Sequence, residues 1–424
     1  MITSEAPSQR RLRLLDAHAY NGFALLTLAG DWRYFEPPGF EGFIAYELHR
    51  NTALVCGDPV CSEADLAPLM TAFAQHCVEK GWRFAFVAAS ARAGKIAARL
   101  EYTVVKIGEE PFLKLDQPGF RGTAAKKARA AINHARKLGV TVKEYAQPSP
   151  ALDVELEDLA REWLAARRTP PMGFILRSSL LAARERKRVF YALYQGRIVA
   201  AISCAPAAAR RMLYIEELVR RPGAPYGASE LLISCAREVA IAEGLSLFGL
   251  GLAPLYGATR QPYGGFRMLR AFIAVLYQRG NYVYGFRSLN HFKKKFAPST
   301  WEDSFFIYQG RLLPVALAVL AALAPGEGIP SLVVPERFAW LRRLPSTVLW
   351  LGAAAGVFAV AFAAWEFPVL SLPVDGALQS ASFLRFSAGL VRALADVTLL
   401  AHRALTLTAL ALAGAWMVWR RARA

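Results

Sequence analysis

The sequence predicts an α/β protein made of two similar lobes and a hydrophobic C-terminal segment. From about residue 20 to residue 310, short strand-like runs alternate with helix-like runs, and this mixture fills two halves of similar length. After about residue 310 the composition changes and apolar residues accumulate. We therefore expect five parts: a loose lead-in (1–19), an N-terminal lobe (20–145), a C-terminal lobe (146–310), a linker with a short apolar helix (311–346) and a helical membrane segment (347–424).

The N-terminal lobe contains one clear helix among several strand candidates. Leu66–Lys80 has apolar residues at helical spacing, and Gly81 follows it in the usual position after a helix end. The strand candidates are Gly42–Tyr46, Thr52–Cys56 and Phe84–Ala88.

The C-terminal lobe repeats this mixture, although no internal repeat is strong enough to prove a duplication. Helices are expected at Leu152–Ala166 and Ser229–Gly244. Strands are expected at Val189–Tyr194, Ile198–Cys204, Arg211–Glu217 and Leu245–Leu250.

Two uncharged, mostly apolar stretches near the C-terminus are candidates for membrane spans. Residues 347–365 have the length of a transmembrane helix, whereas residues 404–419 are borderline. Arginines outside the pair place both ends in the cytosol, although three arginines in the loop between them weaken that argument. The alternative is a buried helical hairpin in a soluble domain. The earlier stretch Leu312–Ala324 is too short to span and is typical of a core or interfacial helix.

The composition favours an anionic partner. The formal net charge is +18, which attracts nucleic acid or an anionic membrane, unless it only reflects a genome rich in Arg and Ala codons. The five cysteines form no Cys-x-x-Cys pair, so we expect no metal site, no disulfide framework and a reducing cytosol. The arginine-rich N-terminus has no apolar run after it, so no secretory signal is expected.

One predicted helix, Thr123–Leu138, carries an unbroken cationic face. Ala128, Ala131, Ile132, Ala135 and Leu138 take the opposite, apolar side. From Arg121 to Lys143 there is no acid, which favours contact with a polyanion over a merely solvated face. On a helical wheel the polar side, within about 100°, consists of Lys126, Arg129, Asn133, Arg136 and Lys137.

Three further segments carry chemistry-bearing residues. In Lys106–Glu110, the neighbouring Glu109 and Glu110 enter a strand and should point to opposite faces, unless they are two solvated acids of a turn. In Phe248–Leu255, the Gly249-Leu-Gly251 exit allows close backbone approach. In Phe286–Pro298, a basic helix presents Arg287, His291, Lys294 and Lys295 near one side. Hydrolase elbows, zinc-protease motifs and Walker loops are absent from the sequence.

Together, these three segments resemble the catalytic domain of lysylphosphatidylglycerol synthases over about residues 20–310. The resemblance implies two tandem GNAT-like acyltransferase lobes and transfer of an aminoacyl group from a charged tRNA to a membrane lipid. This chain departs from the family's Phe-Asn-Leu-Gly-Met-Ala-Pro-Leu at Gly249 and Leu252, and it lacks a Gly-rich loop for CoA, so no cofactor is expected. No flippase precedes the domain, so lipid flipping is expected to be absent.

The resemblance also implies roles for individual residues. Glu217 and Glu230, which replace the family's usual Asp, would hold the aminoacyl ammonium, with Glu109 or Glu110 as further carboxylates. Arg220 and Lys295 would bind phosphate or stabilise the developing oxyanion. The remaining expected substrate-binding residues are Gly251 and the helix residues Lys126, Arg129, Asn133 and Arg136.

The sequence therefore predicts an aminoacyl-tRNA-dependent phospholipid aminoacyltransferase at the cell inner membrane, with its catalytic domain in the cytoplasm. Its expected partners are aminoacyl-tRNA and an anionic phospholipid membrane. Two alternatives stay open: a GNAT-like N-acyltransferase with another amine or hydroxyl acceptor, and a non-catalytic, membrane-tethered binding protein.

Overall fold

The computed structural model describes residues 6–116, 119–147, 149–166, 173–174, 180–264, 273–274, 277–278 and 285–323. The chain divides into two compact units, Met1–Ala339 and Trp340–Ala424. The second unit lies outside the described residues, and so do the predicted spans at 347–365 and 404–419. Among the helices that are described, none is both long and apolar enough to cross a membrane.

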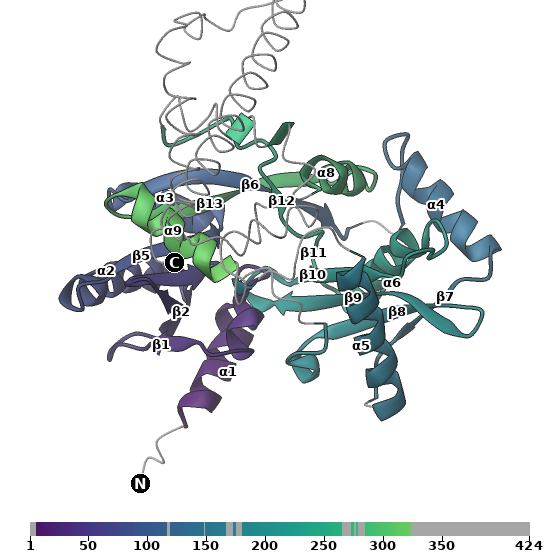
Figure 1. Ribbon diagram of the computed structural model, residues 1–424, viewed down its shortest axis with the longest axis horizontal. Helices are drawn as coiled ribbons and strands as arrows, with labels where there is room; N and C mark the ends of the chain where they lie inside the picture. Colours follow the sequence, from purple (N-terminus) through teal and green to yellow (C-terminus); the bar gives the residue numbers. More distant parts are fainter. Residues whose placement is uncertain are drawn as a thin grey trace, which may run out of the picture. The chain divides into compact units, whose positions relative to one another are not determined.

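The described strands of the first unit form one mixed sheet of 13 strands, in the order β1-β2-β3-β5-β13-β6-β11-β10-β9-β8-β7, with β4 beside β2 and β12 beside β6 (Figure 1). The strands of the first half are β1 Arg33–Phe35, β2 Gly42–His49, β3 Thr52–Cys56, β4 Val60–Cys61, β5 Arg83–Ala89 and β6 Thr103–Lys114. Those of the second half are β7 Thr141–Glu144, β8 Arg188–Tyr194, β9 Arg197–Ala207, β10 Met212–Arg220, β11 Leu247–Gly249, β12 Ala253–Pro254 and β13 Thr300–Tyr308.

The helices pack on this sheet around separate apolar clusters in its two halves. They are α1 Pro7–His18, α2 Glu63–Glu79, α3 Ala91–Arg99, α4 Lys126–Lys137, α5 Pro150–Ala165, α6 Ala228–Ala242, α8 Phe286–Lys294 and α9 Leu312–Leu323. The mixed α/β class predicted from the sequence is thereby confirmed.

Helix α2 shows why the periodic patterns were informative. The Ser62 hydroxyl accepts a hydrogen bond from the Asp65 N–H at 3.1 Å and so caps the first turn. The residues at helical spacing, Leu66, Leu69, Met70, Phe73 and Cys77, are buried. Gly81 follows with φ +68°, the left-handed conformation that glycine adopts without strain.

The first and last described helices, α1 and α9, differ in how well the sequence predicted them. The N-terminal segment was predicted to be loose, which is wrong: α1 buries Leu14 and Leu15, and Arg11 pairs with Glu36 at 3.2 Å. The buried face of α1 consists of only two residues, and among the many arginines of this segment it gave no clear helical pattern in the sequence. Helix α9 is a core helix, as expected, because Val315, Ala318 and Ala322 are buried.

The predicted boundary between lobes stays a prediction, and two packing observations bear on it. Strand β13, from the end of the predicted C-terminal lobe, lies between β5 and β6 of the first half. Helix α4 and strand β7, from the end of the predicted N-terminal lobe, pack beside α6 and β8 in the second half. The two halves therefore exchange elements across a continuous sheet.

The sheet divides locally where β6 meets the second half. Strand β11 pairs with β6 at 112–114 and with β10 at 212–214. The chain then leaves β11 through Leu250–Leu252 and returns to β6 as β12, opposite Gly108 and Glu109. Glu110 lies at this division, and α8 lies against β12.

Candidate active site

Lys106–Glu110 lies inside β6, so the turn considered as an alternative is wrong. Glu109 and Glu110 are both only 6% exposed. Phe305 pairs with Lys106 but Ser304 pairs with Gly108, so Ile107 is an extra residue in the ladder. This bulge turns Lys106 and Glu109 to the same face and leaves Glu110 on the other.

On the first face, Lys106 holds two acids together. Its Nζ lies 2.6 Å from Glu109 Oε1 and 2.6 Å from Asp303 Oδ1. The Gln261 side chain fixes the strand from outside: its Oε1 accepts from the Lys106 N–H at 2.8 Å, and its Nε2 donates to the Lys106 carbonyl at 3.0 Å. Arg260 also approaches Glu109, at 3.7 Å. Glu109 is therefore already paired with a cation of the protein.

On the second face, Glu110 and Lys293 form a buried group of opposite charges. Burial raises the pKa of the Glu110 carboxyl to about 7, and the Lys293 charge opposes this rise. Burial lowers the pKa of the Lys293 ammonium to about 7, again opposed by its partner. Lys293 Nζ donates to the Leu252 carbonyl at 2.6 Å. Both groups can therefore gain or lose a proton near neutral pH, as a general acid or base must.

Gly251 lies directly beside this group. Its φ is +81°, and a Cβ there would lie 3.2 Å from Lys293 Nζ and 3.1 Å from the Ile215 carbonyl oxygen. A side chain at this position would be strained and would crowd the ammonium. The close approach expected at the Gly249-Leu-Gly251 exit is therefore an approach of the backbone to Lys293.

Tyr214 completes the second face. Its ring is fully buried and lies over Gly22 and Gly249, where an added Cβ would come within 1.8 Å and 2.4 Å of ring atoms. Burial raises the pKa of the Tyr214 hydroxyl well above its usual value, and the Glu110 charge raises it further. Gly249, at which the chain departs from the family pattern, thus makes room for this tyrosine.

The structure brings Glu230 and Lys295 into contact with each other. Lys295 Nζ lies 2.9 Å from Glu230 Oε1, and the Glu230 side chain is only 5% exposed. The two residues were expected to bind opposite charges of the substrates, an ammonium and a phosphate or oxyanion. Here each provides the counter-charge of the other and ties α8 to α6.

Glu217 and Arg220 lie further along β10. Glu217 is half-buried and follows a bulge, and Arg220 is exposed at the end of the strand. The bulge residue Glu216, which the sequence did not single out, forms a buried ion pair with Lys187 at 2.6 Å. This ion pair holds β10 in place next to Glu217, before the strand reaches Arg220.

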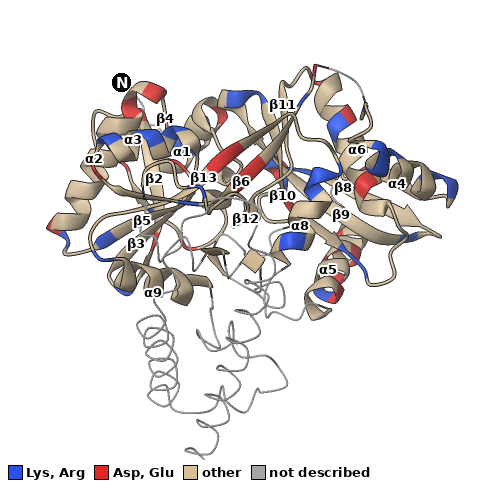
Figure 2. Cartoon of the chain, turned by 90° about the horizontal axis from the view of Figure 1, so that it is seen from above, with Lys and Arg blue, Asp and Glu red and all other residues tan. Residues whose placement is uncertain are grey.

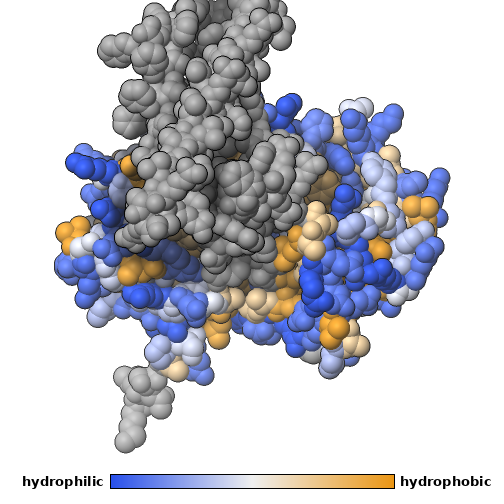
Figure 3. Space-filling view, in the orientation of Figure 1, coloured by the Kyte–Doolittle hydropathy of each residue, from blue (hydrophilic) through white to orange (hydrophobic). Residues whose placement is uncertain are grey.

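The cationic face of α4 is largely as expected. Lys126, Asn133 and Arg136 are exposed, and Figure 2 shows Lys and Arg along α4 and α8 with acids on β6 and β13. Figure 3 shows a mostly hydrophilic surface around α4, with scattered hydrophobic residues. Arg129 differs, because it donates to the Phe120 and Gly122 carbonyls at 3.2 and 2.7 Å. Leu138, expected on the apolar side, is 43% exposed because it follows the helix end.

Lys293 and Tyr214 are the residues that sequence reasoning missed. Lys293 is one of three consecutive lysines, and only the fold shows that it lies with Asn290 on the buried side of α8. The sequence analysis instead selected the basic side of this helix, with Lys294 and Lys295. For Tyr214 the sequence held no signal beyond its position in a strand.

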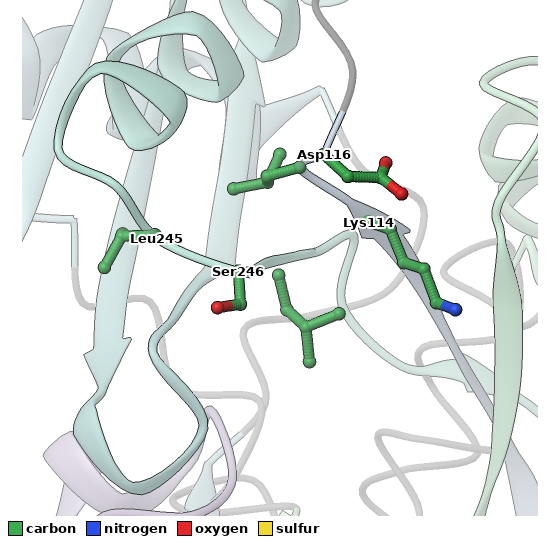
Figure 4. A pocket seen from close by; sticks show the side chains of 6 residues that line it. Lys114, Asp116, Leu245 and Ser246 are labelled. Carbon is green, nitrogen blue, oxygen red and sulfur yellow. The ribbon is translucent and has the colours of Figure 1, made fainter.

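A small pocket of about 360 Å³ lies at the other end of β6, between Lys114–Asp116 and Leu245–Leu247. Figure 4 shows the Lys114 ammonium and the Asp116 carboxylate pointing away from the Ser246 hydroxyl. Its polar groups do not converge, so it is a weaker candidate. Within the described part of the chain, no three His, Cys, Asp or Glu side chains are placed to hold a metal ion.

Comparison with solved structures supports the fold. The L-PGS structure from Bacillus licheniformis superimposes with a TM-score of 0.63 at 24% identity, covering 75% of this chain and 95% of that one. The DUF2156 C-terminal domain of a protein described as a lysylphosphatidylglycerol synthetase from Agrobacterium fabrum gives 0.62 at 22% identity, covering 75% and 96%.

Comparison of sequences identifies the family. The phosphatidylglycerol lysyltransferase of Bacillus subtilis is 25% identical over 328 residues, which cover 76% of this chain but only 37% of that protein. Residues 12–308 match the family model described as phosphatidylglycerol lysyltransferase, C-terminal. Because this match includes most of the chain, the chain belongs to the phosphatidylglycerol lysyltransferase C-terminal family.

Proposed function

We propose that this chain transfers an aminoacyl group from an aminoacyl-tRNA to a hydroxyl of a phosphatidylglycerol-type phospholipid. The observation that carries the proposal is the buried Glu110–Lys293 group beside Tyr214 and Gly251, in a chain of this family. The two GNAT-like lobes, the place at the cytoplasmic face of the inner membrane and the membrane anchor belong to the same proposal.

The reaction needs a proton transfer but no covalent enzyme intermediate. The lipid hydroxyl oxygen attacks the aminoacyl carbonyl carbon, a new ester bond forms, and the bond from that carbon to the tRNA ribose oxygen breaks. The proton of the lipid hydroxyl must reach the departing ribose oxygen. Glu110 and Lys293, both with pKa near 7, are suited to pass it on. Exclusion of water around the buried pair would strengthen the stabilisation of the oxyanion by the Lys293 ammonium.

The other expected residues take supporting roles. Glu217 and Arg220 remain candidates for the aminoacyl ammonium and for phosphate. We assign Glu230 and Lys295 to positioning, because their contact at 2.9 Å holds α8, and with it Lys293, against α6. The exposed residues Lys126, Asn133 and Arg136 would contact a polyanion.

A transfer assay tests the proposal. Purified full-length protein is incubated with labelled aminoacyl-tRNA and phosphatidylglycerol liposomes, and the lipids are separated by thin-layer chromatography. We expect labelled aminoacyl lipid with the wild type and with Glu157→Gln, an exposed control on α5, and a strong loss with Glu110→Gln. Label on a different amine or hydroxyl acceptor would favour an N-acyltransferase. Binding without transfer would favour a non-catalytic protein.

A further inference from the structure

A pocket of about 730 Å³ lies on the face of β6 opposite to Glu110. We call it the Tyr256 pocket; it is lined by Glu109, Tyr256, Thr259, Arg260, Trp301 and Asp303, among others. Its residues come from β6, β13 and the segment that follows β12. The proposed acyl transfer leaves this pocket without a role.

Two aromatic rings form one wall of the Tyr256 pocket. The centroids of Tyr256 and Trp301 are 4.9 Å apart with the planes tilted by 56°, and both residues are only partly buried. The rings therefore keep surface that faces the pocket. Exposed aromatic faces of this kind accept a flat ligand ring by stacking, whichever base it is.

Two cations lie beside this wall. Arg260 has 79% of its side chain exposed, and its nearest acid, Glu109, is at 3.7 Å. The exposed Lys294 places Nζ 4.4 Å from the centroid of the Tyr256 ring. Both cations can therefore meet an anion from solvent without breaking a close ion pair.

The two acids of the pocket do not make it a site for a cation. Lys106 touches both Glu109 and Asp303 at 2.6 Å, so two cations, Lys106 and Arg260, balance the two carboxylates. With Lys294 the surroundings are net positive, which disfavours an amine ligand. The Asp303 side chain is still 31% exposed and can accept a hydrogen bond from a hydroxyl group.

We propose that the Tyr256 pocket binds an unpaired nucleotide, with its base on Tyr256 and Trp301, its phosphate between Arg260 and Lys294, and a ribose hydroxyl at Asp303. Resting on the proposed function, the nucleotide belongs to the unpaired 3′ end of the aminoacyl-tRNA. Glu109 and Lys294 are the chain neighbours of Glu110 and Lys293, and the pocket lies on the other face of β6 from Glu110.

The test measures binding of a fluorescent single-stranded ACCA RNA by anisotropy, with the full-length protein and no aminoacyl group. Tyr256→Ala removes the stacking surface and should weaken binding about tenfold. Arg260→Ala, at an exposed position that cannot perturb the core, should weaken binding and lower the log–log salt slope by roughly 0.7. Arg161→Ala, which removes a 73% exposed arginine of α5, is the matched control and should change neither.

The outcomes separate this proposal from the proposed function. RNA binding that Tyr256→Ala and Arg260→Ala weaken supports the pocket even if no lipid product forms. Binding that both variants leave unchanged overturns the pocket, and the transfer assay can still succeed. If Arg260→Ala weakens binding to phosphatidylglycerol vesicles but not to RNA, the pocket receives a lipid headgroup and the nucleotide proposal is wrong.

Discussion

Lys293 and Lys295 lie two residues apart on one helical segment and have opposite surroundings. Lys295 keeps 24% of its side chain exposed and contacts the Glu230 carboxylate at 2.9 Å. Lys293 is buried, donates to a neutral carbonyl, and has a pKa lowered to about 7. The Lys295 side chain therefore links α8 to α6, whereas burial allows the Lys293 ammonium to release its proton near neutral pH.

The largest expected effect tests the Lys293 side of this comparison. Lys293→Met keeps much of the volume and removes the titrating amine, so transfer should fall by about 100-fold or more. Melting temperature should fall, because the buried Glu110 loses its counter-charge and the Leu252 carbonyl loses its donor, so transfer is compared at a temperature at which the variant is folded. The transfer assay and thermal melting measure the two effects.

Lys95→Met, at an exposed position of α3, is the control and should keep full activity. A folded Lys293→Met protein with wild-type transfer would show that Lys293 takes no part in the chemistry. The comparison between the two lysines would then describe packing alone.

The second effect tests the Lys295 side. Lys295→Met leaves the buried Glu230 carboxylate without its partner and should lower the free energy of unfolding by about 2–4 kcal/mol, the lower part of this range applying because Lys295 is partly exposed. The double variant Glu230→Gln/Lys295→Met should recover a large part of this loss. Urea unfolding of the wild type, Glu230→Gln, Lys295→Met and the double variant measures the coupling. If Lys295→Met has normal stability but no transfer activity, Lys295 binds substrate, as the sequence predicted, and does not only position α8.

How much of this arrangement the sequence predicted depends on the range of the interactions. Strands such as Thr52–Cys56 and helices such as α2 were found where predicted, because their periodic patterns are local. The placement of β13 between β5 and β6 was not predicted, since pairing of segments so far apart leaves no local pattern. The same holds for Lys293: three consecutive lysines look alike until the fold buries one of them.

The third effect is a dependence of stability on pH. The pKa of Glu110 is raised from 4.5 to about 7, so between these pH values the folded state holds more protons and the free energy of unfolding falls as pH rises. The pKa of Lys293 is lowered from 10.5 to about 7, so above pH 7 the free energy of unfolding rises again. The two groups together should give a minimum near pH 7.

The double variant Glu110→Gln/Lys293→Met removes both titrating groups and should flatten this minimum. Urea unfolding at pH 5, 7 and 9 compares it with the wild type. The pair Glu230→Gln/Lys295→Met should leave the minimum in place. If the wild type shows no minimum relative to the first double variant, the two pKa values are not displaced toward each other.

The smallest effect extends the same distinction, between cations with and without a protein partner, to α4. Arg129 donates to two carbonyls of the 120–122 loop, whereas Lys126 is exposed and Arg136 only approaches Glu238 at 4.0 Å. Lys126→Ala/Arg136→Ala should therefore lower the log–log salt slope of tRNA binding by roughly two, with little change in melting temperature. Arg129→Ala should lower the melting temperature and change the slope less. Filter binding at several salt concentrations measures the slopes, and equal slopes for all three proteins would mean that the α4 face is only solvated.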